Sequence, residues 1–412
     1  MATRMDRRTE ILDTAAELFA TSGVRTSLKE IADACGIQAG SLYHHFDSKE
    51  AIFVELIERY RADLLTLASD ARAELARGGD RSALDRIVAL GTALAECGVR
   101  HRAALLLTLN EPPTGAGEEL VRVSSPMPLA IDAAMLELVQ AGVGDGEIRA
   151  DLDAEMFADQ MCQAMLHTTV ALLPDDTGAV QVARIRCLAL LHGIAANPPT
   201  DDALDRSAAL LAVDEVIASW MEPEDEDESL TLLRAVARAE FGRRGYDATT
   251  IRDIAAAAGF STASIYRRFA SKDELLGSIM DSFASKVSAA WSAALGAPST
   301  VIERIDAIAW ANINVVDRSS DEFHVLQNWL REAPPSTRGR GWTFLTRLHE
   351  IEALIDEGSR TGELVLGTDD PRLAPWALFH LLWLPENLVR RGGLTAARGF
   401  VRATVLRGAA TS

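Results

Sequence analysis

The sequence predicts an all-α protein in which one helical unit is present twice. Alanine and leucine dominate a composition that is 48% hydrophobic but only 6% aromatic, and glycine and proline fall between long periodic stretches. The ten residues "SLYHHFDSKE" at 41–50 return as "SIYRRFASKD" at 264–273, and seven of the ten positions agree in type. A chain of 412 residues is also too long for a single hydrophobic core. Together these observations predict two helical units.

The repeat extends well beyond those ten residues. Equivalent upstream positions carry the same residue types, in the pairs Phe19 and Phe241, Gly23 and Gly245, Ile31 and Ile254, and Gly36 and Gly259. Much further along, "LVQAGVGDGEIRADLD" from Leu138 resembles "LIDEGSRTGELVLGTD" from Leu354. Because the two pairs of similar segments occur in the same order in each half, we expect the whole unit to be duplicated.

We expect five segments along the chain, namely a first head at residues 1–50, a helical domain at 51–221, an acidic linker at 222–228, a second head at 229–273 and a second helical domain at 274–412. The linker holds six carboxylates around one proline, and such a run cannot bury a core. Just before it, residues 201–220 have the pattern of a single amphipathic helix with no counterpart after the second unit. This helix either carries the chain back toward the second head or packs as a terminal helix.

Within the first head, the spacing predicts two short helices joined by a tight turn. Ser27 is placed to cap the first of them, with Glu30 three residues on as in a capping box. That helix stops at Gly36, and a second short helix follows at residues 39–46. Such a helix-turn-helix can place its second helix in the major groove of DNA, although many helical proteins contain the same arrangement.

The residue types on the second short helix strengthen the DNA-binding interpretation. The helix begins with small or polar residues, which permit a close approach to base edges. These residues are Gln38, Ala39, Gly40 and Ser41. Tyr43 and His45 are expected on the outer side, where a hydroxyl and an imidazole can donate to phosphates. Lys49 follows the cap Ser48 of the next helix, where a cation opposes the helix dipole, so we interpret it as a phosphate contact.

The second head repeats these features with more positive charge. Arg267 and Arg268 replace His44 and His45, and Lys272 matches Lys49. Residues 229–277 contain eight basic and five acidic residues, a net charge of +3, whereas residues 1–50 contain six basic and eight acidic residues, a net charge of −2. We therefore expect the second head to bind DNA more strongly. If the Tyr and Phe residues of this helix served only as core aromatics, that would explain their presence in one copy. It would not explain why a polar face accompanies them in both copies.

The segments "IADACGIQAGSLYHHFDSKEAIF" and "IAAAAGFSTASIYRRFASKDELL" both resemble the DNA-binding head of the TetR/AcrR family of one-component transcriptional repressors. The resemblance covers roughly the first 50 residues of each half, and the rest fits only in being helical and of suitable length. It implies that bases are read by Gln38, Ala39, Gly40, Ser41, Ser261, Thr262, Ala263 and Ser264. It implies phosphate or nearby DNA contacts at Lys29, Tyr43, His44, His45, Lys49, Arg252, Tyr266, Arg267, Arg268 and Lys272.

Two heads in one chain depart from the single head per subunit that the family implies. Family members place two recognition helices on half-sites about one helical turn apart through a two-fold dimer. A fused pair can do this at high effective concentration with no dimerisation step. We therefore expect an intramolecular pseudo-dimer, with a homodimer of tandem chains carrying four heads as the alternative. Because the two recognition sequences differ, we expect an asymmetric operator.

Beyond each head, long helices carry stripes that could line a ligand site. The polar and aromatic positions in question are Phe157, Met161 and His167 in the first half, and Trp310, Asn314, His324, Asn328, His380 and Trp383 in the second. Ordinary packing is the competing interpretation of each stripe. The resemblance implies a small apolar effector that releases the protein from double-stranded DNA.

Other classes of protein have less support. No glycine-rich nucleotide motif, nucleophile elbow or HExxH is present, so we predict no enzyme, cofactor or metal. Cys35, Cys97, Cys162 and Cys187 lack ligand spacing, which favours buried free thiols over a redox or metal role. No apolar run suggests a membrane span or signal peptide, which favours the cytoplasm. The net charge of −19 keeps one alternative open, a helical receptor in which one or both heads do not bind DNA.

Overall fold

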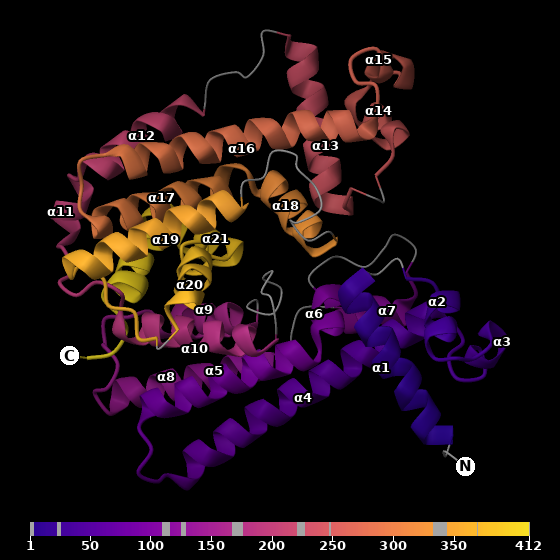
Figure 1. The fold of residues 1–412 in the computed structure, drawn as a ribbon, viewed down its shortest axis with the longest axis horizontal. Helices are drawn as coiled ribbons and strands as arrows, with labels where there is room; N and C mark the ends of the chain where they lie inside the picture. Colours follow the sequence, from indigo (N-terminus) through magenta and orange to yellow (C-terminus); the bar gives the residue numbers. More distant parts are fainter. Residues whose placement is uncertain are drawn as a thin grey trace. The chain divides into compact units, whose positions relative to one another are not determined.

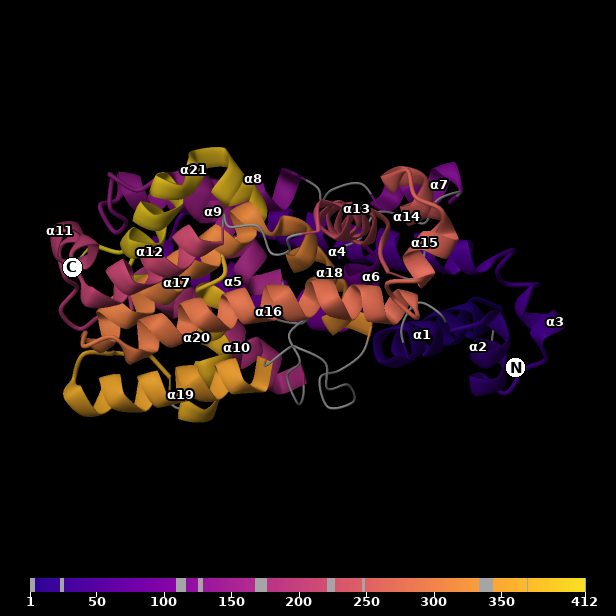
Figure 2. The same cartoon turned by 90° about the horizontal axis from the view of Figure 1, so that it is seen from above.

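The computed structural model confirms the all-α prediction (Figures 1 and 2). It describes residues 4–411 except 23–25, 109–115, 125–128, 167–175, 221–226, 247–248, 333–343 and 369. Within those ranges the chain forms helices, and its β-structure is confined to two isolated bridges. In the same ranges, no helix is both long enough and apolar enough to span a membrane.

The chain divides into two compact units that do not follow the sequence repeat. One unit comprises Met1–Asp145 and Met161–Ala183, and the other comprises Gly146–Gln160 and Arg184–Ser412. The second unit therefore contains the whole second repeat together with parts of the first. The five segments expected from the sequence remain a prediction, and each unit is described here by itself.

The first unit begins with the first head and continues into long helices. Its elements are α1 (Arg4–Ser22), α2 (Leu28–Ala34), α3 (Ala39–Leu42), α4 (Lys49–Arg77), α5 (Ala83–Arg100), α6 (Arg102–Thr108), α7 (Glu118–Ser124) and α8 (Leu129–Gly144). In Figure 1, α4, α5 and α8 pack along one another, and α6 packs against α1. Two further helices, α9 (Ala154–Leu166) and α10 (Asp176–His192), contribute residues to both units.

The second unit repeats this order after two additional helices. Its elements are α11 (Asp201–Asp205), α12 (Ala208–Ser219), α13 (Glu228–Arg244), α14 (Ile251–Ala258), α15 (Thr262–Tyr266), α16 (Lys272–Gly296), α17 (Val301–Arg318), α18 (Ser320–Glu332), α19 (Phe344–Thr361), the 3-10 turn η3 (Pro371–Leu373), α20 (Ala374–Leu381), α21 (Glu386–Val401) and the π-turn η4 (Arg402–Leu406). The second head, α13 to α15, lies at the start of α16 (Figure 2).

Helix caps fix which positions of the two copies are equivalent. Ser48 and Ser271 cap α4 and α16, and each accepts a hydrogen bond from the backbone three residues on. Ser82 and Thr300 cap α5 and α17 in the same way. Counting from these caps aligns the buried faces of the paired helices, so a residue in one copy can be compared with its equivalent in the other.

The last helices of the two copies meet through reciprocal backbone hydrogen bonds, all within the second unit. The chain leaving α10 donates to the end of η4, and the chain leaving η4 donates to the end of α10. The bonds are Ile194 N to Val405 O (2.9 Å), Ala195 N to Leu406 O (3.1 Å), Ala409 N to Leu190 O (3.0 Å) and Ala410 N to Leu191 O (2.7 Å). Ile148 also forms a bridge with Ala410, and its equivalent Leu364 forms one with Ala195. Each contact therefore has a partner related by exchange of the two copies.

Two glycines lie at the centre of this reciprocal contact. Gly193 and Gly408 have positive φ angles of 74° and 84°, a region that glycine adopts without penalty. A Cβ atom on Gly193 would lie within 3 Å of the backbone of Arg407, and one on Gly408 would lie within 3 Å of the backbone of His192. Only a residue without a side chain allows the two chain segments to approach this closely.

The prediction of one helix at residues 201–220 is wrong. The chain forms two helices there, because Ser207 turns its side chain back to cap α12 and accepts a hydrogen bond from the backbone of Leu210. α12 packs against α16 and α17, as the terminal-helix interpretation expected. α11 is fastened by Arg402, which donates to Asp205 at 2.7 Å and forms a buried ion pair with Asp306.

Candidate DNA-binding heads

The first head forms the predicted helix-turn-helix. Ser27 and Glu30 form the capping box at the start of α2, which confirms that part of the sequence analysis. Leu42 and Phe46 are buried in the head, which fixes α3 against α2. α3 ends at Leu42, earlier than expected, so His44 and His45 lie in the turn that follows the helix. Gly23, the counterpart of Gly245 in the repeat, lies outside the described residues.

The predicted reading face of the first head is open to solvent. Gln38, Ala39, Gly40 and Ser41 are all exposed, and no Cβ contact lies within 4 Å of Gly40. Tyr43 has 54% of its surface exposed, which is high for a large aromatic side chain. Lys29 and His44 are exposed beside it, and His45 is half-buried. This surface is available for a ligand, as the prediction requires.

Lys49 has a structural role that the sequence did not reveal. Its ammonium lies over the rings of Phe19 and Phe53, at 5.9 and 5.4 Å from their centroids. Partial burial lowers the pKa of Lys49. The premise that this lysine had no structural reason to be there is therefore wrong, and its contact with a phosphate remains a prediction.

The second head has the same fold with a better-capped recognition helix. Ser261 caps α15 by accepting from the backbone of Ser264 at 3.1 Å, whereas Gln38 makes no such side-chain bond at α3. Tyr266 is 54% exposed, the same fraction as its equivalent Tyr43. Ser261 and Ala263 are exposed, and Thr262 and Ser264 are half-buried.

Two cations of the second head, Lys272 and Arg268, are held by neighbouring protein groups. Lys272 donates to the carbonyl oxygens of Tyr246 (2.7 Å) and Thr249 (2.9 Å) and lies 4.0 Å from the centroid of the Tyr246 ring. Arg268 donates to Asp227 (3.2 Å) and to the Ser229 hydroxyl (2.6 Å). Lys272, like Lys49, therefore has structural partners, and its phosphate contact also remains a prediction.

Acidic neighbours offset much of the positive charge of the second head. Carboxylates pair with four of its arginines, in the contacts Arg238 with Glu322, Arg243 with Glu240, Arg244 with Glu240 and Arg268 with Asp227. Arg252 and Arg267 are exposed and form no ion pair within the described part of the chain. Glu322 and Asp227 lie outside the residues counted for the net charge of +3, so that value overstates the charge that the head presents. DNA contacts by Arg252 and Arg267 remain a prediction.

Most of the predicted ligand-site residues have packing partners. Trp310 donates to Asp214 of α12 at 2.7 Å and lies under the guanidinium of Arg398. His324 pairs with Glu386 at 2.9 Å, and the ring of His380 lies 3.0 Å from the carbonyl of Trp376. Phe157 and Met161 are fully buried, whereas His167 and the side chain of Asn328 lie outside the described residues. These contacts fit the packing interpretation, and a ligand site at these residues remains a prediction.

Two of the predicted ligand-site residues each have a buried polar atom that lacks a hydrogen-bond partner among the described residues. The amide nitrogen of Asn314 donates to Trp310, but its Oδ1 has no partner within the described residues. The indole Nε1 of Trp383 also has none there, although its ring stacks on Phe323 at 5.1 Å between centroids. These atoms can accept from and donate to a bound molecule.

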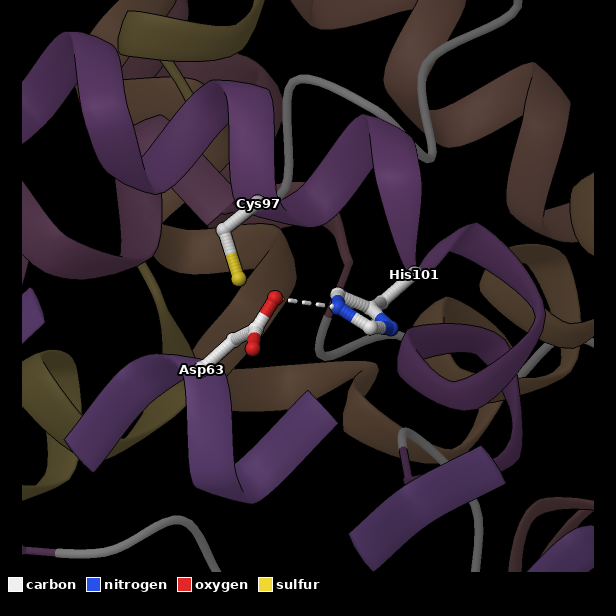
Figure 3. Close-up of side chains that lie close together, drawn as sticks. All are labelled: Asp63, Cys97 and His101. Carbon is white, nitrogen blue, oxygen red and sulfur yellow. Dashed lines mark hydrogen bonds and ion pairs between the residues drawn. The ribbon is translucent and has the colours of Figure 1, made fainter. Parts of the chain in front are cut away.

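Three side chains that no sequence pattern links come together between α4 and α5. Asp63, Cys97 and His101 bring one donor atom each within 4.8 Å of one another (Figure 3). His101 contacts Asp63 at 2.8 Å, and Arg100 pairs with the same carboxylate oxygen at 2.9 Å. Burial and the Asp63 carboxylate raise the pKa of Cys97 to about 11. No sequence motif signals this group, because Asp63 lies on α4 whereas Cys97 and His101 lie on α5 and at its end.

Comparison with known proteins identifies both heads. The model of a family described as "Bacterial regulatory proteins, tetR family" matches residues 11–56 and 233–279. The HTH-type transcriptional repressor KstR2 of Rhodococcus jostii is 37% identical over 151 residues, which are 36% of this chain and 72% of the relative. Its Mycobacterium tuberculosis counterpart is 30% identical over 36% of this chain and 73% of the relative. The solved structure of the M. tuberculosis ketosteroid transcriptional regulator KstR2 matches at 26% identity and a TM-score of 0.37, covering 44% of this chain and 92% of that one.

Proposed function

Because the chain belongs to the TetR family of bacterial transcription regulators, we propose that this single chain acts as the equivalent of a family dimer. It presents two unlike heads to one asymmetric operator and represses until a small apolar effector binds. The relatives are transcriptional repressors that carry a helix-turn-helix, which supports repression over activation.

The reciprocal contact between α10 and η4 carries the pseudo-dimer proposal. In a two-fold dimer, the same patch of each subunit faces the other, so every contact occurs twice with the partners exchanged. The four backbone hydrogen bonds around Gly193 and Gly408 have this property within one chain. In a contact of this kind, the surface that would bind a second subunit is covered by the other copy of the same chain. This favours one chain per operator over a dimer of tandem chains.

The difference between the two recognition helices supports an asymmetric operator. Gln38, Ala39 and Gly40 in one head correspond to Ser261, Thr262 and Ala263 in the other, and side chains of different size and polarity favour different base edges. Binding selection from random duplexes is the test. We expect two unlike half-sites about one helical turn apart. Recovery of a perfect palindrome would contradict the proposal.

The proposed DNA contacts are those predicted from the sequence, but the exposed side chains are now the main proposed phosphate contacts. Base reading is assigned to the starts of α3 and α15, and phosphate binding to Tyr43, Tyr266, Arg252 and Arg267, all of which are exposed. A mobility shift at low and moderate salt tests this assignment, because each lost phosphate contact lowers the salt dependence of binding. Failure to shift selected or upstream duplexes would favour a helical receptor whose heads no longer bind DNA.

For the effector, we propose a site in the second copy around Asn314 and Trp383. The support is two buried polar atoms without a hydrogen-bond partner among the described residues, Asn314 Oδ1 and Trp383 Nε1, together with the stacking of the Trp383 ring on Phe323. A largely apolar molecule with one hydrogen-bond donor and one acceptor would satisfy both atoms and pack on the rings. Asn314→Leu is expected to abolish effector-driven release of DNA while leaving operator affinity within about twofold. Unchanged release would place the effector elsewhere.

A further inference from the structure

We propose that Asp63, Cys97 and His101 bind a divalent transition-metal ion of the zinc class in the first copy. The three side chains lie on two packed helices, where Asp63 is on α4, Cys97 is on α5 and His101 ends α5. Cys97 and His101 are four residues apart and so lie on one face of the helix. Carboxylate, thiolate and imidazole are the three ligand types that Zn²⁺ takes from proteins.

The spacing of the donor atoms suits such an ion. In a tetrahedral zinc site with bonds of about 2.0–2.3 Å, ligand atoms lie roughly 3.3–3.8 Å apart. Here all three donor atoms lie within 4.8 Å of one another, and the Asp63 and His101 atoms are 2.8 Å apart. A shift of about 1 Å in the side chains, with Arg100 leaving the Asp63 oxygen, would bring all three to bonding distance. Figure 3 shows the three groups pointing toward a common centre.

Tyr60 provides a second observation that points to a ligand at this place. It lies one turn before Asp63 on α4, and its ring centroid is 5.8 Å from that of His101. The side chain is fully buried, yet its hydroxyl has no hydrogen-bond partner within the described part of the chain. Three protein ligands leave one position of a tetrahedral ion open, and a water bound there would be a partner for this hydroxyl.

The duplicated scaffold shows that packing alone does not call for these residues. Counted from the helix caps, the second copy has Phe283, Lys286, Val315 and Ser319 where the first copy has Tyr60, Asp63, Cys97 and His101. Phe283 and Val315 are buried like their counterparts. The same fold is thus satisfied by side chains that offer no thiolate, imidazole or carboxylate. Core packing therefore does not explain why the first copy has a carboxylate, a thiol and an imidazole at these positions.

Accessibility is also suitable, because the group is buried on one side and open on the other. Cys97 has 1% of its surface exposed, whereas the Asp63 side chain is 40% exposed. An ion can therefore enter past Asp63 and reach the thiol. Since α4 begins at Lys49 in the first head, an ion joining α4 to the end of α5 would fix the helix that connects this head to its unit.

Titration of the full chain with Co²⁺, a spectroscopic substitute for Zn²⁺, tests the proposal. We expect one bound ion per chain with a thiolate-to-cobalt charge-transfer band that Zn²⁺ removes. Cys97→Val and His101→Ser, which introduce residues of the second-copy type, should abolish the band and weaken binding at least tenfold with an unchanged circular dichroism spectrum. Cys187→Ala, which removes a buried thiol elsewhere, should leave the band intact.

Two outcomes would overturn the site. Either the chain takes up no Co²⁺ at micromolar concentration, or the band persists in Cys97→Val. The binding test does not involve DNA, so it stands or fails separately from the proposed function. As the regulatory part of the inference, Zn²⁺ should change operator affinity at least threefold in the native chain and not in Cys97→Val. A cobalt band with no change in operator affinity would leave the site in place and remove its regulatory role.

Discussion

The two copies of the repeat make equivalent contacts where they touch each other, whereas their heads share one fold but differ in charge and in the partners of their cations. Around Gly193 and Gly408, every backbone hydrogen bond has a counterpart with the copies exchanged. At the heads, by contrast, His44 corresponds to Arg267, and Lys49 and Lys272 have different partners. A shared contact constrains both copies at once, whereas a surface that meets an outside partner can change in one copy alone. Fusion of two units therefore preserves a two-fold contact while freeing the heads to diverge.

The largest expected effect concerns the buried ion pair that only the second copy contains. Arg402 pairs with Asp306 at 2.7 Å, and both side chains are almost fully buried. Burial raises the pKa of Asp306, which Arg402 counteracts. Arg402→Ala leaves an unpaired buried carboxylate, so we expect a loss of about 3–5 kcal/mol in the free energy of unfolding, measured by urea denaturation.

The first copy suggests how this loss can be reversed. The corresponding turn of α10 carries Cys187 and Leu188, and Val88 corresponds to Asp306. The double variant Arg402→Leu with Asp306→Val should recover most of the lost stability, because apolar pairs often replace buried ion pairs without cost. Arg372→Ala, at an exposed pair, serves as the control and should change stability by less than about 0.5 kcal/mol. An Arg402→Ala variant as stable as this control would show that the pair matters little.

The next effect tests the reciprocal contact. Gly193→Ala and Gly408→Ala each place a Cβ against the backbone of the other copy and require a left-handed conformation. We expect each to lower the free energy of unfolding by about 2–4 kcal/mol, combining conformational strain with overpacking. The two losses should agree within about 1 kcal/mol, since the positions are equivalent.

Gly399→Ala is the matched control for this pair, because Gly399 lies in α21 and a Cβ atom added there would have no neighbouring atom within 4 Å. It should be neutral or slightly stabilising. A large loss at one of Gly193 and Gly408 with none at the other would break the two-fold relation on which the pseudo-dimer proposal depends.

A smaller effect distinguishes the heads. Arg267→Ala should weaken operator binding about tenfold and lower the slope of log affinity against log salt by about 0.9, because an exposed, permanently charged group is lost. His44→Ala, at the equivalent position, should weaken binding less than about threefold, since an imidazole does not supply the permanent charge of a guanidinium. Fluorescence anisotropy on a labelled operator measures both. Equal losses would show that the heads share the electrostatic contribution equally.

The smallest expected effect is a gain in affinity. Hydrogen bonds from Ser229 and Arg268 lower the pKa of Asp227 to about 2, so this carboxylate stays charged beside the second reading face. Asp227→Ser keeps a good cap for α13 and frees Arg268 from its acidic partner. Operator affinity should rise two- to threefold at low salt, and the gain should shrink as salt screens the charges. A loss of affinity would mean that Asp227 positions Arg268 for DNA.

Local patterns allowed much of the fold to be predicted from the sequence. The capping box at Ser27 and the cap at Ser48 are encoded by residues three apart, and the duplicated head is readable by sliding the chain on itself. The pairing of Arg402 with Asp306 and the approach of Gly193 to Gly408 depend on residues about 100 to 215 positions apart, which no local pattern relates.

The same distinction applies to the candidate sites. Exposure of Tyr43 and Tyr266 followed from helical spacing in the heads. The partners of Lys49 and Lys272 did not, because ring faces and backbone carbonyls leave no signature in the sequence. The Asp63, Cys97 and His101 group was missed for a related reason, since its spacing arises only when α4 and α5 pack.

The mass of the protein–operator complex, measured by native mass spectrometry on an operator obtained by selection, tests the central claim most directly. The account predicts one 44.4 kDa chain per duplex, occupying both half-sites. Two chains per duplex at saturation would contradict it, because four heads would then be needed where the pseudo-dimer supplies two.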